Sequence, residues 1–162
     1  MHNVHTSPMP SLFGQCPKFL FFFIFMAPLF TDRILQLVQD NFKNFHPGKR
    51  TLYGLLKLRS LNLSHNSISH LVDANFDGLG SLRSLSLRHN SIKSITSAAF
   101  HHLKGLEDLF LDHNNIRELA PRIFYKLDRL KHLDLSNNKL LLVDEEVLKA
   151  GVNTLLKMRK KL

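Results

Sequence analysis

Apolar residues recur along the middle of this chain in four segments that superimpose at a fixed step of 24 residues. Each segment has the pattern L-x-x-L-x-L-x-x-N-x-[I/L]-x-x-[L/I/V], and the segments begin at Leu58, Leu82, Leu106 and Leu130. The alternating leucines have the period of a β-strand, so they point inward while the residues between them face solvent. One such strand cannot bury its leucines alone, and stacked copies give a parallel sheet with a shared core.

Two further columns repeat with the same step and are explained by stacking rather than by chemistry. An asparagine follows each strand where the chain turns away, and its amide is expected to pair with backbone groups that the turn leaves free; these are Asn66, Asn90, Asn114 and Asn138. A phenylalanine recurs later in each unit and is expected to fill the convex side of the core; these are Phe76, Phe100 and Phe124.

This repeat resembles the leucine-rich repeat family, in the 24-residue form common in extracellular proteins. The resemblance covers about Leu52 to Leu148, because Leu52 and Leu55 continue the pattern as a partial unit. It implies an α/β solenoid shaped as a horseshoe, with short parallel strands on the concave face and an irregular or short helical convex side. The domain organisation it suggests is an N-terminal segment at 1–50, repeats at 51–148 (one partial and four recognisable) and a basic tail or capping helix at 149–162.

The N-terminal segment carries one targeting feature, an apolar run at 19–30 that follows Lys18. Its 12 residues are too few to span a bilayer, which takes roughly 20. That length suits the core of a secretion signal, although Ala27-Pro28 is a poor cleavage site and non-native or mis-joined sequence is the alternative. The remainder, Thr31 to Arg50, matches no repeat.

The C-terminal end has two interpretations. The repeat pattern fails there, because Lys160 falls where an inward leucine is needed, which suggests a fragment or an incomplete sequence. Alternatively, Asp144 caps an amphipathic helix that begins through Glu145 and Glu146. The basic residues that suit the negative end of its dipole are Lys157, Arg159, Lys160 and Lys161.

Charge and cysteine content limit the possible partners. The formal charge is +9, but the stretch from Leu58 to Asp144 holds 11 Lys/Arg against 9 Asp/Glu, so the excess lies in the flanks. We therefore expect no nucleic-acid partner, because the repeats lack a basic stripe with interleaved aromatics. The single Cys16 leaves no cysteine-rich caps of the family kind, so self-association through uncapped ends is a further expectation.

The outward strand positions are where the family usually binds. The candidate partner-binding residues are Arg59, Arg83, Arg88, Glu107, Asp108, Phe110, Asp112, His132 and Asp134. Phe110 is the one large aromatic among them, and it is either a binding hot spot or a residue that packs on its neighbours. Opposite charges in adjacent repeats, Arg83 with Glu107 and Arg88 with Asp112, predict cross-strand ion pairs.

Two constellations suggest other chemistry. His65, His89 and His113 share one column, which invites a zinc site, but the column has no carboxylate or cysteine, so we expect no metal; a pH-sensitive interface is the milder alternative. Ser84, Asp108 and His132 share another column, but a hydrolytic triad needs the histidine between the other two. We therefore expect no enzyme, no cofactor and no small-molecule substrate.

The function expected from the sequence is a non-enzymatic module that binds a protein ligand on its concave face. Phrases such as Leu63-Ser64-His65-Asn66-Ser67-Ile68 resemble those of cell-surface receptors that join these repeats to immunoglobulin-like domains. That favours part of a membrane receptor or adhesion-type glycoprotein, extracellular, with a possible N-glycosylation site at Asn62 in Asn62-Leu63-Ser64. The alternative is a cytoplasmic scaffold or adaptor, which the lone cysteine permits.

Overall fold

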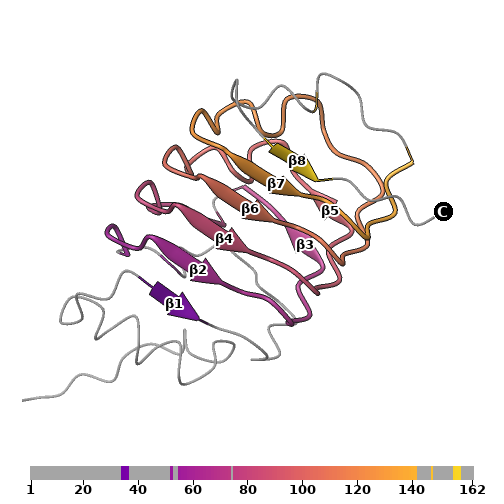
Figure 1. Ribbon diagram of the computed structural model, residues 1–162, viewed down its shortest axis with the longest axis horizontal. Helices are drawn as coiled ribbons and strands as arrows, with labels where there is room; N and C mark the ends of the chain where they lie inside the picture. Colours follow the sequence, from indigo (N-terminus) through magenta and orange to yellow (C-terminus); the bar gives the residue numbers. More distant parts are fainter. Residues whose placement is uncertain are drawn as a thin grey trace, which may run out of the picture.

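The computed structural model describes residues 55–73 and 75–141, Leu52, Val147, and the backbone of two short flanking strands. Its main feature is a six-stranded parallel sheet in the order β1-β2-β4-β6-β7-β8. Figure 1 shows these strands side by side in one row, with β3 and β5 behind them. The strands are β1 (Ile34–Gln36), β2 (Ser60–Asn62), β4 (Ser84–Ser86), β6 (Asp108–Phe110), β7 (His132–Asp134) and β8 (Leu155–Lys157). We call the solvent side of this sheet the strand face; it corresponds to the concave face predicted above.

The register of the central strands follows the 24-residue repeat. Leu61 pairs with Leu85, Leu85 with Leu109, and Leu109 with Leu133. These four leucines are buried, while the residues on either side of each in its strand are mostly half-buried or exposed. Because side chains alternate along a strand, an unbroken register keeps every leucine of the column in the core and every polar neighbour on the strand face.

The other side of the solenoid is irregular. A second parallel pair joins β3 (His70–Leu71) and β5 (Ser94–Ile95), with Leu71 opposite Ile95. The rest of this side consists of turns, and no helix occurs in residues 55–73 or 75–141. The solenoid is therefore confirmed. The resemblance implied a convex side that is either irregular or short helical, and the described residues have the irregular form.

Between the two sides, leucine and phenylalanine columns form one continuous core. The rings of Phe76 and Phe100 stack with centroids 6.2 Å apart, and those of Phe100 and Phe124 with centroids 5.9 Å apart. All three rings are fully buried. The predicted role of the phenylalanine column in the core is confirmed, and the ring of each repeat stacks on that of the next.

The asparagine column ties successive repeats together. The Asn114 amide nitrogen donates to the carbonyl of Leu111 in its own repeat at 3.0 Å and to that of Leu87 in the repeat before it at 3.0 Å. Its amide oxygen accepts from the backbone N–H of Ile92 at 3.0 Å. Asn90 and Asn138 make the equivalent bonds one repeat earlier and one repeat later. Each asparagine thus pairs backbone groups that the turn takes out of the sheet, as predicted.

At both ends the sheet continues further than the fixed step indicates. Leu35 of β1 lies opposite Leu61, an offset of 26 residues, so a search at a constant step of 24 assigns no repeat to that segment. Leu156 of β8 lies opposite Leu133, an offset of 23. Leu155–Lys157 is therefore strand and not part of the capping helix considered above, because the edge of β7 offers backbone groups that a further parallel strand satisfies.

The remaining features of the two ends lie outside the described residues. These are the apolar run at 19–30, Cys16 and the helix start proposed at Asp144. Within the part of the chain that the structure describes, no helix has the length and apolar character needed to cross a membrane.

We expect replacement of Asn114 by alanine to lower the free energy of unfolding by about 2–4 kcal/mol, since it leaves the buried N–H of Ile92 unpaired and removes three bonds to carbonyls. Chemical denaturation of the full chain measures this. Asn115→Ala is the matched control, because Asn115 is half-buried and its side chain makes no hydrogen bond within residues 55–73 and 75–141. Equal effects of the two changes would contradict a special role for the column.

Candidate functional site

The strand face is built from β2, β4, β6 and β7 together with the residues that flank each strand. Register places one residue from each repeat in each column, about 4.8 Å from its neighbours. The predicted partner-binding residues therefore share one surface, and all of them except Arg59 belong to one of three groups of contacts there. Arg59, at the N-terminal side, is exposed and makes no ion pair with any described residue.

Arg88 is the centre of the largest group. Its guanidinium carbon lies 4.5 Å from the centroid of the Phe110 ring, a cation–π contact. Its Nε donates to Asp112 Oδ1 at 2.7 Å, and its Nη2 lies 3.8 Å from Asp134 Oδ2. The predicted Arg88–Asp112 pair is confirmed, and Phe110 packs on a neighbour while remaining half-buried.

The carboxylates of Asp112 and Asp134 are largely buried, and hydrogen bonds from neighbouring residues hold them in place. The side chains of Asp112 and Asp134 are 6% and 9% exposed, against 42% for Arg88. Burial disfavours the charged form of Asp112, but hydrogen bonds from His113 and Arg88 outweigh it, so the pKa of Asp112 lies below its usual range. Asp134 Oδ1 accepts from the N–H of Ser136 at 3.0 Å and from its hydroxyl at 2.6 Å. In this group, two largely buried carboxylates hold an arginine that stacks on an aromatic ring.

Glu107 is the centre of a second group. Arg83 Nη1 donates to its Oε1 at 3.2 Å, as predicted, and Lys131 Nζ donates to its Oε2 at 2.6 Å. The hydrogen bond from Lys131, opposed by desolvation and aided by the charge of Arg83, lowers the pKa of Glu107. Lys131 was not among the predicted site residues; its signal is its place one repeat after Glu107 in the same column.

The column of Ser84, Asp108 and His132 forms the third group. Register sets Ser84 opposite Asp108 and Asp108 opposite His132. His132 Nδ1 lies 2.6 Å from Asp108 Oδ1, so the acid sits between the serine and the imidazole. A nucleophilic triad requires the histidine between the serine and the acid, so that the imidazole can take the proton of the serine. The order in this column is different.

The histidine column lies in the turns that follow the strands. The rings of His65 and His89 stack with centroids 4.4 Å apart, and those of His89 and His113 with centroids 4.2 Å apart. Desolvation, followed by the charges of His113 and His65, lowers the pKa of His89. The column itself contains no carboxylate, but Asp112, one position before His113, places its Oδ2 3.0 Å from His113 Nδ1. Alignment of the repeats does not indicate this contact, because Asp112 and the histidines belong to different columns.

Asn62, the asparagine of the glycosylation sequence, lies in β2 on the strand face and is half-buried. Its Oδ1 accepts from the N–H of Ser64 at 3.0 Å and from the Ser64 hydroxyl at 2.6 Å. Asp134 makes the same two bonds to Ser136 three repeats later. The arrangement is a local turn that two different residue types support equally.

We expect the stability difference between the wild type and Glu107→Gln to depend on pH. The depressed pKa means that Glu107 stabilises the fold fully above the ordinary glutamate pKa of about 4.3, and that this contribution is lost as pH falls through the folded-state value. Urea unfolding at pH 7 and at pH 3 measures the difference, which narrows in acid and in high salt. Glu118→Gln is the control, because Glu118 is exposed and makes no ion pair with any described residue. A gap that is constant across this range would contradict the role of the charge.

The chain is similar to parts of two solved structures. The chain resembles a chain in the Toll–Spatzle complex of Drosophila, with a TM-score of 0.59 and 25% identity over 65% of this chain and 14% of that one. It also resembles a chain in the TLR13–ssRNA13 complex, with a TM-score of 0.53 and 26% identity over 65% of this chain and 18% of that one. The chain thus spans less than a fifth of either relative. No curated protein sequence gives a significant match.

A family model described as "Leucine rich repeat" matches residues 33–92 and 81–140. These ranges include β1 through β7 and the asparagine and phenylalanine columns. The family match begins at residue 33, and β1 begins at Ile34. The matched range and the parallel sheet therefore begin at the same place in the chain. The chain belongs to the leucine-rich repeat family, whose repeats form protein-interaction modules.

Proposed function

We propose that this chain is a non-enzymatic module that binds a protein ligand on the strand face, as part of an extracellular receptor or adhesion-type protein. The observation that carries the proposal is the group of Arg88, Phe110, Asp112 and Asp134 in the middle of that face. Arginine and aromatic residues dominate binding energy at protein interfaces, chiefly where they are central and well packed. The strand face supplies such a centre with charged groups around it.

The arrangement of Arg88 lowers the cost of binding. Its guanidinium is already held by Asp112 and by the Phe110 ring, so less side-chain entropy is lost when a partner covers it. The ring and the guanidinium offer flat surfaces, and the carboxylates beneath satisfy the charge without facing the partner. A partner with an acidic or aromatic side chain at its own centre fits this chemistry.

A protein ligand is favoured over nucleic acid on electrostatic grounds. The basic side chains Arg83, Arg88 and Lys131 of this face are each paired with a carboxylate, so they are not free to neutralise a phosphate backbone. Of the relatives, Toll is in complex with the protein Spatzle and TLR13 with an RNA. Exclusion of nucleic acid thus remains part of the proposal, together with the absence of catalysis and of a small-molecule substrate.

Binding to a library of extracellular ectodomains displayed on cells tests the proposal. We expect Phe110→Ser to weaken binding by about 30-fold, the effect of losing a residue worth roughly 2 kcal/mol. Serine is a conservative choice for the fold, because Ser86 occupies the same column in β4.

Tyr125→Ser is the matched control. Tyr125 is an exposed aromatic that follows the buried Phe124, away from the strand face, where its ring meets His101 edge-on at 5.6 Å. The proposal predicts that ligands captured by the wild type are also captured by this variant. Ligands lost with Tyr125→Ser and kept with Phe110→Ser would move the binding surface to the other side. Capture of no ectodomain, together with binding of a single-stranded RNA in a separate titration, would contradict a protein ligand.

Secretion and glycosylation test the extracellular part of the proposal. Expressed in secretory cells, the full chain is expected in the medium, cleaved after the run at 19–30, with a glycosidase-sensitive mass increase at Asn62. Asn62→Asp removes the acceptor and keeps the local bonds, because Asp134 makes the same bonds to Ser136 that Asn62 makes to Ser64. An uncleaved and unglycosylated product confined to the cytosol would favour the intracellular scaffold.

A further inference from the structure

Three histidines project from equivalent turns on a rigid backbone. His65, His89 and His113 have positive φ angles of 57°, 50° and 55°, and Asn137 continues the column with 53°. The His89 N–H donates to the Asp112 carbonyl at 3.2 Å, and the His113 N–H donates to the Ser136 carbonyl at 3.0 Å. These bonds fix the backbone under the rings, while the imidazoles themselves remain exposed to solvent.

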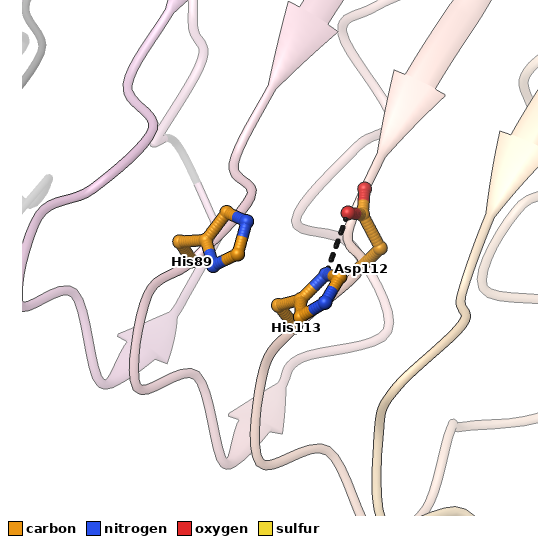
Figure 2. Close-up of side chains that lie close together, drawn as sticks. All are labelled: His89, Asp112 and His113. Atoms are coloured by element: carbon orange, nitrogen blue, oxygen red, sulfur yellow. Dashed lines mark hydrogen bonds and ion pairs between the residues drawn. The ribbon is translucent and has the colours of Figure 1, made fainter. Parts of the chain in front are cut away.

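Asp112 brings a carboxylate to two of these rings. Figure 2 shows His89, Asp112 and His113 close together, with Asp112 Oδ2 directed at His113 Nδ1. The other oxygen, Oδ1, is held by Arg88 Nε at 2.7 Å. Arg88 thus orients the Asp112 carboxylate through Oδ1, and Oδ2 faces the histidines.

We propose that His89, Asp112 and His113 form a binding site for a divalent transition-metal ion of the Zn²⁺ class, through one imidazole nitrogen from each histidine and one carboxylate oxygen. The three ligand atoms lie within 4.8 Å of one another. Ligands at about 2.0–2.1 Å around a tetrahedral Zn²⁺ are roughly 3.3 Å apart. The 3.0 Å separation of His113 Nδ1 and Asp112 Oδ2 already matches this, and the ion replaces the proton that now joins them.

The remaining contraction requires side-chain rotation, in which the His89–His113 ring stack and the 3.1 Å hydrogen bond between Asn137 Nδ2 and His113 Nε2 are exchanged for bonds to the ion. The two rings stack almost in parallel, with 22° between their planes, so a nitrogen of each must turn toward the carboxylate. Both rings are exposed, which lets them turn without disturbing the core. The charges nearby suit a cation, because Asp112 and Asp134 together outweigh Arg88. Two imidazoles with one carboxylate favour Zn²⁺, Cu²⁺ or Ni²⁺ over Mg²⁺ or Ca²⁺.

Three protein ligands leave the fourth position of a tetrahedral ion open. Arg88 links this ion to the binding group, because it holds Asp112 and stacks on Phe110. The open position is filled by water or by a donor atom from a bound partner. The site itself does not depend on the proposed function, since metal binding is measured without any partner.

Calorimetric titration of the metal-free full chain with Zn²⁺ tests the site. We expect His89→Asn and His113→Asn each to weaken the site by at least about tenfold, since even loss of an outer-shell partner typically costs that much. Asparagine suits both positions, because Asn137 adopts the same positive φ in the next repeat. Thermal unfolding without metal, unchanged in both variants, shows that the fold is kept.

His65→Asn is the matched control, because it has the same backbone geometry and the same column but lies outside the three-residue set. It is expected to bind like the wild type, and one equivalent of Cu²⁺ is expected to show electron-paramagnetic coupling to two nitrogen donors in both. No Zn²⁺ binding by the wild type would overturn the proposal. So would affinity unchanged by His89→Asn and His113→Asn, or a loss in His65→Asn equal to theirs.

Discussion

The parallel register between repeats is the constraint on which the rest of this structure depends. A single unit has three strand residues and cannot bury its own leucines, so each unit is stable only against its neighbours. The register places Leu61, Leu85, Leu109 and Leu133 in one buried row. The Asn114 amide, bonded to Leu87 and Ile92 of the repeat before it, then holds the turn of one repeat against the next.

The same register creates the candidate binding surface. Because side chains alternate, the positions beside each buried leucine must face solvent, and the 24-residue step brings residues from four repeats within contact distance. Arg88 meets Asp112 and Phe110 although they are far apart in sequence. The core therefore requires only that these positions be outward, and leaves their chemistry free to be adapted to a partner.

The turn position occupied by His65, His89 and His113 has a backbone requirement, a positive φ, and a side chain that can take part in binding. The turn requires a positive φ, which His65, His89, His113 and Asn137 all adopt. Asparagine and histidine both tolerate this region. Where histidines occur in successive repeats they stack, and where an aspartate precedes one of them a carboxylate joins the stack, as Asp112 does.

The 24-residue spacing is sufficient to predict the solenoid, its leucine, asparagine and phenylalanine columns, and the ion pairs of Arg83 with Glu107 and Arg88 with Asp112. These follow from a constant step, because equal spacing implies adjacency in stacked repeats. The strands at the two ends and the contacts between columns do not follow from a constant step, and they are known only from the tertiary structure. The offsets of 26 and 23 that extend the sheet through β1 and β8 depend on edge pairing rather than on spacing. Contacts that cross between columns, such as Arg88 on Phe110 and Asp112 on His113, depend on side-chain direction, which repeat alignment does not specify.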